Sequence, residues 1–421
     1  MCFTPRVIPH GTSFRDLRRT RGRGNHRAGR KIGQRREARR PPHLELLLLL
    51  LRPELVKDDL ERATALAATV EWSPVIAYAE RHRVVPALQR GAASLPDVVP
   101  SAIANELRAR RTAHVIRTLS LCADLVSALD ALSAAGIDAI AYKGPSLSVQ
   151  AHGDVTAREF EDLDLLVRPR DALRAGGALL EAGFDGPPPL AGVDERRLLR
   201  AGHERQYRGP GGSLVEVHWT PAPRYHSIAL PSDALLTAAV AVTIAGRRVP
   251  TLCPEDTVVT LAVDAGKELF PTLRVAVDTA AFLVRHPHLD WRAVIEAAER
   301  AGAGRMLRVL LALARGLQAA PLPVSVHAAI DADAVSVELA AGFADRMLGP
   351  PGGLGRLPAL DHRHLALRER RYDRARYLGR LAVTPTAEDI VFISLPPWTG
   401  ALYLPIRTAR LGAKYWRGSV T

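Results

Sequence analysis

Apolar residues recur three or four positions apart in the first third of the chain and again in its second half. From Leu44 to about Ala134 this spacing, interrupted by loop-forming residues at 91–100, is typical of helices that bury one face. One such set lies late in this region: Leu119, Ala123, Val126 and Leu129. The spacing returns beyond Pro254, for example at Leu307, Leu310, Leu311 and Ala314. We therefore predict two helical regions with a different kind of segment between them.

The segment between the helical regions has short apolar runs bounded by turn residues. Such runs at 137–142 and 162–167 predict two buried strands. A helix is expected after each strand, at about 146–152 and 171–182, with Asp171 as the N-cap of the second. The order of elements is therefore strand, helix, strand, helix.

A hairpin is predicted to follow. Residues 204–208 and 213–219 flank the turn sequence Gly-Pro-Gly-Gly at 209–212. We predict an α+β protein, in which a small core with a mixed sheet is flanked by N-terminal and C-terminal helical regions. The expected divisions are a disordered basic leader (1–43), an N-terminal helical region (44–134), the core (135–252), a helical bundle (253–348), and a Pro/Gly-rich break followed by an Arg-rich helix and a tail (349–421).

The strong basic charge is concentrated at the start of the chain. Residues 1–43 hold thirteen Lys and Arg against Asp16 and Glu37, so they carry +11 of the net charge of +13. Because this segment lacks apolar periodicity, we expect it to be disordered. We interpret it as a functionless or misassigned leader, with a polyanion-binding arm and a targeting signal as alternatives.

A second basic stretch, the Arg-rich helix expected at about 365–381, also gives little support for a nucleic-acid partner. Glu369 and Asp373 are interspersed among its arginines, so a solvated face is the favoured interpretation. With the body of the chain nearly neutral, nucleic acid is not an expected partner.

No stretch of the sequence predicts a membrane span, a disulfide framework or a zinc site. The six leucines at 46–51 are far short of the ~20 residues that a span needs and predict a buried first helix. The three cysteines are far apart and form no CxxC pair, which favours a reducing cytoplasm. The histidine pairs 286/288 and 362/364 have no third ligand nearby, which disfavours zinc.

The run Glu-Asp-Leu-Asp-Leu-Leu-Val at 161–167 carries the candidate chemistry. Since side chains alternate along a strand, Asp162 and Asp164 share one face, roughly 7 Å apart, while the leucines face the core. Two such carboxylates repel each other unless a cation lies beside them. Mg²⁺ suits the pair because it prefers oxygen ligands and completes its shell with water and phosphate. In the predicted hairpin Glu216 adds a third acid, on the same face as His218, although an edge position with satisfied hydrogen bonds is the simpler interpretation of that histidine.

A candidate phosphate site precedes the acids. Lys143-Gly144-Pro145-Ser146 lies between the first strand and its helix, where free backbone N–H groups and the positive end of the helix favour an anion. Ser146 is placed to cap that helix or to contact a triphosphate. Lys143 and Arg158 are cations close to the acids in sequence, and either is a candidate for the β- and γ-phosphates.

These residues resemble a family of uncharacterised bacterial nucleotidyltransferases with a polymerase-beta-like fold, in which Lys-Gly-Pro and an Arg precede Asp-x-Asp-Leu-Leu-Val. The resemblance covers about 370 residues, all but the basic leader, and includes these segments: 72–85, 139–184, 216–219, 264–278, 289–291 and 395–397. Two departures from the wider superfamily are a Gly-Pro-Ser loop in place of Gly-Ser and the sixteen positions between Ser146 and Asp162. In addition, this chain has Asp264 where the family commonly has His.

The resemblance implies a role for each matching position. Asp162, Asp164 and Glu216 are implied to be metal ligands and catalytic acids. The implied nucleotide-binding residues are Lys143, Gly144, Ser146, Arg158 and Lys267.

The expected function is therefore the transfer of a nucleoside monophosphate from an NTP to an unknown acceptor, with Mg²⁺ as cofactor. Two ions would act together, one on the attacking hydroxyl and one on the departing pyrophosphate. The acceptor could be a small molecule, a peptide or a protein hydroxyl or phosphate. The alternative from another class is a noncatalytic module that binds a nucleotide and a partner protein on the same fold.

Overall fold

The computed structural model describes residues 40–187, 199–200, 202–350, 361–383 and 405–406. Residues 43–421 form one compact unit, and the elements below belong to it apart from the first residue of α2. Residues 1–39 of the expected leader and the expected tail with Pro396 lie outside the described residues.

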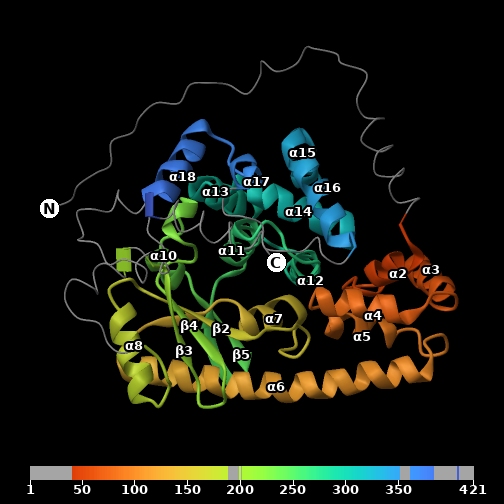
Figure 1. The fold of residues 1–421 in the computed structure, drawn as a ribbon, viewed down its shortest axis with the longest axis horizontal. Coiled ribbons are helices and arrows are strands. Elements are labelled where there is room, and N and C mark those ends of the chain that lie inside the picture. The colour runs from red at the N-terminus through yellow and green to blue at the C-terminus, as the bar shows by residue number, and fades with distance from the viewer. Residues whose placement is uncertain (1–39, 188–198, 201, 351–360, 384–404, 407–421) are drawn as a thin grey trace, which may run out of the picture. The chain divides into compact units, whose positions relative to one another are not determined.

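Five helices form the N-terminal region: α2 (Pro42–Leu50), α3 (Lys57–Ala67), α4 (Trp72–Arg81), α5 (Val85–Ala92) and α6 (Ser101–Ala134). Leu46–Leu51 are buried, as the sequence predicted for this apolar run. The 34-residue α6 takes part in two cores. Leu107 packs with the helical core, whereas Leu121, Leu125 and Leu132 pack under the sheet. One long helix therefore connects the N-terminal helices to the sheet (Figure 1).

The central sheet has four strands, β1 (Ala139–Ala141), β2 (Asp162–Val167), β3 (Glu204–Arg208) and β4 (Leu214–His218). Their spatial order is β1-β2-β4-β3, and only the β2–β4 pairing is parallel. Helices α7 (Gly144–His152) and α8 (Ala172–Glu181) follow β1 and β2. The predicted mixed sheet and the β3–β4 hairpin are thus present.

The structure corrects one detail of this region and adds a hairpin that the sequence reading missed. Asp171 stands at the N-cap of α8 but makes no capping hydrogen bond, because its carboxylate accepts instead from Arg174, at 2.8 Å. Strands β5 (Val240–Ile244) and β6 (Arg247–Thr251) form a separate two-stranded sheet. Ala245 and Gly246 join them with φ values of +50° and +77°, as a type I′ turn requires.

The described residues beyond 253 form the helices α11 (Pro254–Lys267), α12 (Arg274–Arg285), α13 (Trp291–Ala301), α14 (Gly304–Gln318), α15 (Val324–Ala332), α16 (Ala334–Leu348), α17 (His362–Ala366) and α18 (Arg371–Val383). Helix α14 is buried along most of its length and packs against α11, α12, α13, α15 and α16. It is therefore the central helix of the predicted bundle. Between the sheet and this bundle lie the short η1 (Arg224–His226) and α10 (Ser232–Thr237).

The Arg-rich segment is not the single solvated helix that the sequence predicted. It is split into α17 and α18, and Arg368 between them is only 1% exposed. The guanidinium of Arg368 lies 3.7 Å from the ring centroid of Tyr377 and donates to the carbonyl oxygen of His226 at 2.7 Å. These contacts hold the Arg368 guanidinium between the helix break and η1, so the Arg368 side chain is buried rather than exposed at the surface.

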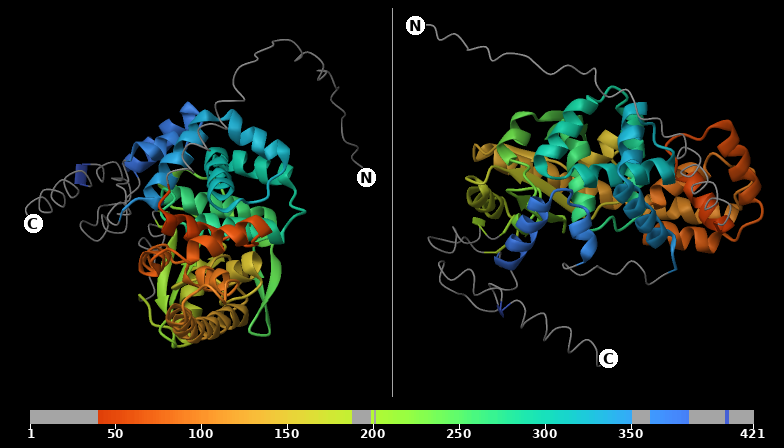
Figure 2. Two further views of the ribbon diagram at one scale, coloured as in Figure 1. Left: turned by 90° about the vertical axis from the view of Figure 1, so that its right-hand side faces the viewer. Right: turned by 90° about the horizontal axis from the view of Figure 1, so that it is seen from above.

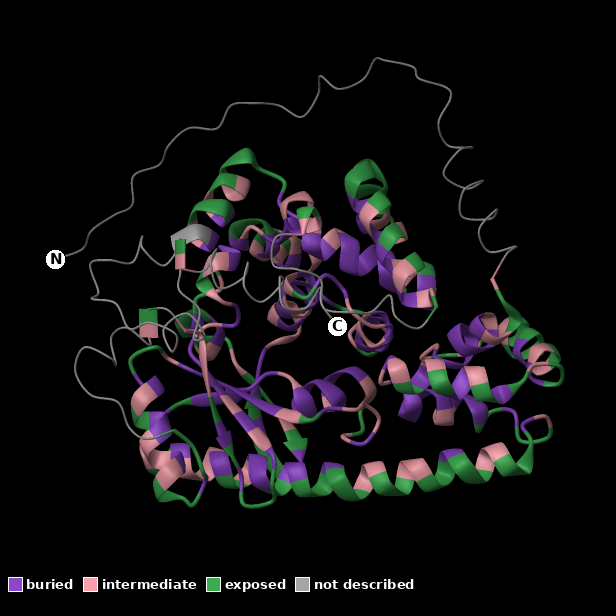
Figure 3. Cartoon of the chain, viewed as in Figure 1, coloured by how far each residue is buried: buried purple, intermediate pink, exposed green. Residues whose placement is uncertain are grey.

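The sheet separates an apolar side from a polar side. Helices α6 and α8 cover the face that carries Leu163, Leu165, Val215 and Val217. The C-terminal helices lie on the other side in both Figure 1 and the side view of Figure 2. Figure 3 shows the sheet interior as buried and the outer side of α6 as exposed. No helix in the described ranges has the length and apolar character needed to cross a membrane.

Candidate active site

Strands β2 and β4 bring two of the predicted acids side by side. Asp164 and Glu216 are register partners in the parallel ladder, and Asp162 lies two residues earlier on the same face of β2. Leu163 and Leu165 point the other way into the core. Alternation along two neighbouring strands therefore places the three carboxylates on the polar face of the sheet.

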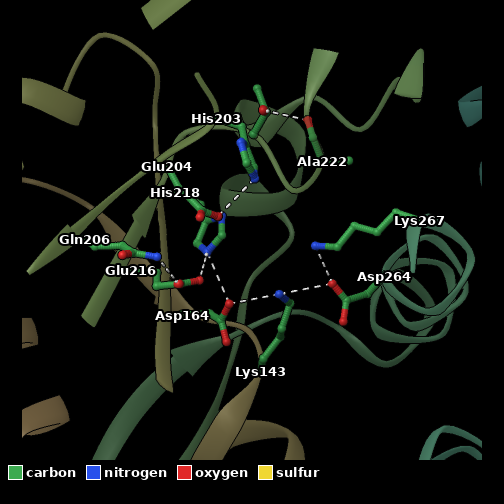
Figure 4. A network of polar contacts seen from close by, with 11 residues as sticks. Lys143, Asp164, His203, Glu204, Gln206, Glu216, His218, Ala222, Asp264 and Lys267 are labelled. Carbon is green, nitrogen blue, oxygen red and sulfur yellow. Dashed lines mark hydrogen bonds and ion pairs between the residues drawn. The ribbon is translucent and has the colours of Figure 1, made fainter. Parts of the chain in front are cut away.

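Asp164 is the most enclosed of the three acids. Its side chain is 1% exposed, and its Oδ1 lies 2.9 Å from Lys143 Nζ and 3.2 Å from His218 Nε2 (Figure 4). Burial alone would raise the pKa of Asp164, but the charge of Lys143 and the contact with His218 outweigh it and hold that pKa well below the usual range. Asp164 is therefore ionised in the folded protein.

Asp162 and Glu216 have fewer partners. Glu216 Oε1 accepts from Gln206 Nε2 at 2.8 Å, and its Oε2 lies 3.3 Å from His218 Nε2. The Asp162 side chain makes no hydrogen bond or ion pair within the described part of the chain. Burial, and after it the negative charge of Asp164, raises the pKa of Asp162. This corner of the site thus has an excess of negative charge.

Lys143 links the sheet to the C-terminal helices. It stands at the N-cap of α7, and its Nζ lies between Asp164 Oδ1 and Asp264 Oδ1, the second at 3.1 Å. Asp264 in turn lies 2.7 Å from Lys267 Nζ, three positions further along α11. Burial would lower the pKa of Lys143, but the charges of Asp164 and Asp264 raise it well above its ordinary value. Both predicted lysines therefore lie against Asp264.

The predicted phosphate loop lies against β2. Gly144 has φ +48°, and a Cβ there would lie 3.1 Å from the Asp162 carbonyl oxygen, so glycine permits this close approach. Ser146 is fully buried, and its Oγ has no hydrogen-bond partner among the described residues. The Ser146 N–H donates to the Lys143 carbonyl at 3.1 Å, so this amide is already engaged within the turn.

Arg158 is turned away from the acids toward α12. Its Nε donates to Asp278 Oδ2 at 2.7 Å, and the other oxygen of Asp278 lies 3.0 Å from His152 Nε2. The side chain of Arg158 is 9% exposed. Burial lowers the pKa of Arg158, but Asp278, with smaller contributions from Asp162 and Asp164, raises it overall. Within the described part of the chain Arg158 therefore pairs with Asp278 and makes no hydrogen bond or ion pair with the acids, although their charges act on it.

The site also contains three residues that were not predicted from the sequence to belong to it: His218, Glu204 and Asp264. His218 is 1% exposed, and β4 is an interior strand covered by β3, so the interpretation as an edge histidine is wrong. Its Nε2 faces Asp164 and Glu216, and its Nδ1 lies 3.3 Å from Glu204 Oε2. The sequence did carry a signal for two of them, since His218 alternates with Glu216 and Asp264 stands three positions before Lys267 on a helix.

The histidine pairs considered for zinc lie elsewhere. His286 Nε2 is 3.2 Å from the Gln150 carbonyl oxygen, and His364 is buried beside Tyr377. Within the described ranges, two other groups bring three metal-ligating atoms within 4.8 Å of one another: Asp164, Glu216 and His218, and His203, Glu204 and His218. The first of these groups contains two of the three predicted acids.

A cavity of about 200 Å³ lies apart from these acids. Its lining residues are Glu80, Val85, Pro86, Gln89, Arg110, Arg111, His114 and Glu159. None of the predicted site residues lines it, so the convergence of charged groups rather than this cavity marks the candidate site.

Comparison with known proteins identifies a family. Residues 68–318, more than half of the chain, match the model of a family described as uncharacterised nucleotidyltransferase, and this range contains every acid and cation of the network. A solved structure, an antigenic nucleotidyltransferase-like protein from Paracoccidioides brasiliensis, is 17% identical over 48% of this chain and 94% of that chain, with a TM-score of 0.27. No curated protein matches. The chain belongs to the family of uncharacterised nucleotidyltransferases.

Proposed function

We propose that the protein is a metal-dependent nucleotidyltransferase that moves a nucleoside monophosphate from an NTP to an acceptor hydroxyl or phosphate and releases pyrophosphate. The observation that carries the proposal is the convergence of Asp162, Asp164 and Glu216 on one face of two adjacent parallel strands, in a chain of this family. Three acids grouped in this way are the ligand type that hard divalent cations prefer.

The residues present fit a divalent cation. Asp162 has a carboxylate without a partner in the described structure, and its pKa is raised by burial and by Asp164, so a positive charge beside it would be stabilising. Asp162, Asp164 and Glu216 would hold Mg²⁺. When bound, the metal would neutralise charge on the triphosphate and activate the attacking oxygen.

The cations of the site supply the second part of the proposal. Lys143 and Lys267 both lie against Asp264, which is ionised because its pKa is far below the usual range, burial being outweighed by the two lysines. The two ammonium groups are balanced by Asp164 and Asp264 in this structure. With divalent metal on the acids, they would be available to bind the triphosphate and orient it toward the polar face of the sheet. Gly144 would let the chain approach the bound nucleotide closely at the start of α7.

The test is transfer of label from each α-³²P-labelled NTP, with Mg²⁺, to a panel of acceptors containing alcohols, phosphates, peptides and proteins. Calorimetry with the same NTPs measures binding separately. We expect transfer to fall by about 10²–10³-fold in Asp162→Asn and in Asp164→Asn. Asp97→Asn, at an exposed turn, is the matched control and should transfer like the natural chain.

Asp162→Asn keeps the test informative if Asp164→Asn fails to fold, because Asp162 has no partner to lose. Binding of NTP without release of pyrophosphate, unchanged in Asp164→Asn, would contradict the proposal. That result would favour the noncatalytic nucleotide-binding module.

A further inference from the structure

A second group of metal-ligating atoms lies where the β3–β4 ladder begins. Glu204 and His218 are register partners on the two antiparallel strands, and His203 directly precedes β3. Glu204 Oε2 lies 3.0 Å from His203 Nε2 and 3.3 Å from His218 Nδ1 (Figure 4). The carbonyl oxygen of His203 also accepts from the Trp219 N–H at 2.9 Å, so the hairpin fixes the backbone on both sides of the group.

The buried ring of His218 has unmet bonding capacity. It is 1% exposed, and both of its nitrogens lie within 3.3 Å of carboxylate oxygens. Neither nitrogen, however, makes a hydrogen bond within the described structure. The ring thus has carboxylates on both sides but no formed hydrogen bond, and a metal ion at Nδ1 would give that nitrogen a bond in place of its contact with Glu204.

We propose that His203 Nε2, Glu204 Oε2 and His218 Nδ1 form a binding site for a divalent transition metal of the Zn²⁺, Co²⁺ or Mn²⁺ class. The three atoms lie within 4.8 Å of one another, which one ion can span. Two imidazoles and one carboxylate are a ligand set that such metals favour over Mg²⁺, whose preferred ligands are oxygens. Three protein ligands leave a fourth position for water or for a substrate atom.

This site is chemically distinct from the acids although it shares His218 with them. A neutral imidazole ligates through one nitrogen and keeps a proton on the other. Metal at Nδ1 therefore leaves Nε2–H to face Asp164 Oδ1 at 3.2 Å and Glu216 Oε2 at 3.3 Å. His218 would then connect the transition metal to the carboxylates and fix their orientation, as outer partners of metal ligands commonly do. The metal site itself does not depend on the proposed function, whereas this orienting role does.

The experiment measures metal binding by the full chain. Protein stripped with a chelator is titrated with Co²⁺, followed by its visible absorption, and Zn²⁺ is then used to displace it. With excess Mg²⁺ present to occupy the acids, we expect one Co²⁺ bound with a spectrum of mixed nitrogen and oxygen ligands, and its displacement by Zn²⁺. In His203→Ala and in Glu204→Gln the affinity for Zn²⁺ should fall by at least ~100-fold.

Two control variants locate the metal. Asp162→Asn alters only the acid group, and His288→Ala removes an exposed histidine, so both should bind Zn²⁺ like the natural chain. An affinity in His203→Ala and Glu204→Gln within about twofold of the natural chain would overturn the inference, as would an equal loss in Asp162→Asn. Circular dichroism confirms that each variant is folded, and Glu204→Gln, which keeps the size of the side chain, serves if His203→Ala is not.

Nucleotide transfer measured on the same samples separates this inference from the proposed function. Transfer that persists while Zn²⁺ affinity is unchanged in His203→Ala and Glu204→Gln overturns the metal site alone. Zn²⁺ binding that depends on His203 and Glu204, in a protein that transfers no nucleotide, supports the metal site and counts against the function alone.

Discussion

Removal of the Lys143 ammonium tests the charge balance of the site most directly. In Lys143→Met, Asp164 is left 1% exposed with only His218 as a partner. Asp264 loses less, because its side chain is 35% exposed and keeps Lys267 at 2.7 Å. Breaking a buried ion pair by removing one partner costs about 3–5 kcal/mol. Since only one of the two carboxylates is left enclosed, we expect the lower end, about 3 kcal/mol of unfolding free energy.

The assay is urea unfolding of the full chain in EDTA, followed by circular dichroism. Lys143→Met/Asp164→Asn should be more stable than Lys143→Met, because the uncompensated buried charge is gone. Lys57→Met is the control, since Lys57 is exposed and lies 3.8 Å from Glu61, so its loss should cost less than ~1 kcal/mol. Adding Mg²⁺ should stabilise Lys143→Met more than the natural chain, because no lysine competes for Asp164.

Two outcomes would refute this reasoning. One is a loss in Lys143→Met as small as that in Lys57→Met. The other is a double variant, Lys143→Met/Asp164→Asn, that is no more stable than Lys143→Met. Either would mean that Lys143 does not neutralise Asp164 in the folded protein.

Three further predictions concern His82, Arg158 and Gly144. Burial lowers the pKa of His82 from 6.5 to about 4, so the stability contributed by its neutral form is complete above pH 6.5 and is lost as pH falls toward 4. Acid unfolding should therefore show a loss of about 3 kcal/mol in the natural chain that His82→Gln lacks. Equal stability profiles of the two proteins against pH would disprove this. Arg158→Met should destabilise the fold by about 3–5 kcal/mol, because buried Asp278 loses its charged partner. In thermal unfolding, Arg158→Met/Asp278→Asn should recover part of this stability. A double variant as unstable as Arg158→Met would exclude the pairing. Gly144→Ala should lower stability by about 1–2 kcal/mol, because φ at this position is +48° and the new Cβ would crowd the Asp162 carbonyl oxygen. A melting temperature equal to that of the natural chain would contradict the strained geometry.

Local patterning predicted much of the fold. Alternation in 162–167 gave the bounds of β2 and the face of its acids, because a two-residue period is a direct consequence of strand geometry. The hairpin β5–β6 was missed although Ala245-Gly246 lies at its turn. In β6, Arg247, Arg248 and Thr251 are polar and Pro250 is unusual in a strand, so the strand signal was weak on that side of the turn.

Long-range pairing is what the sequence reading could not supply. Arg158 was placed near the phosphates because it stands close to the acids in sequence, yet its partner Asp278 lies 120 positions later. In the same way Asp264 pairs with Lys143 only because α11 packs opposite the polar face of the sheet. Which strand covers β4, and hence whether His218 is buried, likewise depends on strand order. None of these facts has a local period or spacing that would reveal it.

The bridge made by Lys143 has a consequence for how such a protein can diverge. One ammonium group balances Asp164 on the sheet and Asp264 on a helix a hundred positions further along. Loss of the negative charge at position 264 would therefore change the electrostatic potential at Asp164 without any substitution of Asp164 itself. The residue at 264, which lies outside both the Lys-Gly-Pro and the Asp-x-Asp motifs, therefore sets the charge around the acids even where those motifs are unchanged.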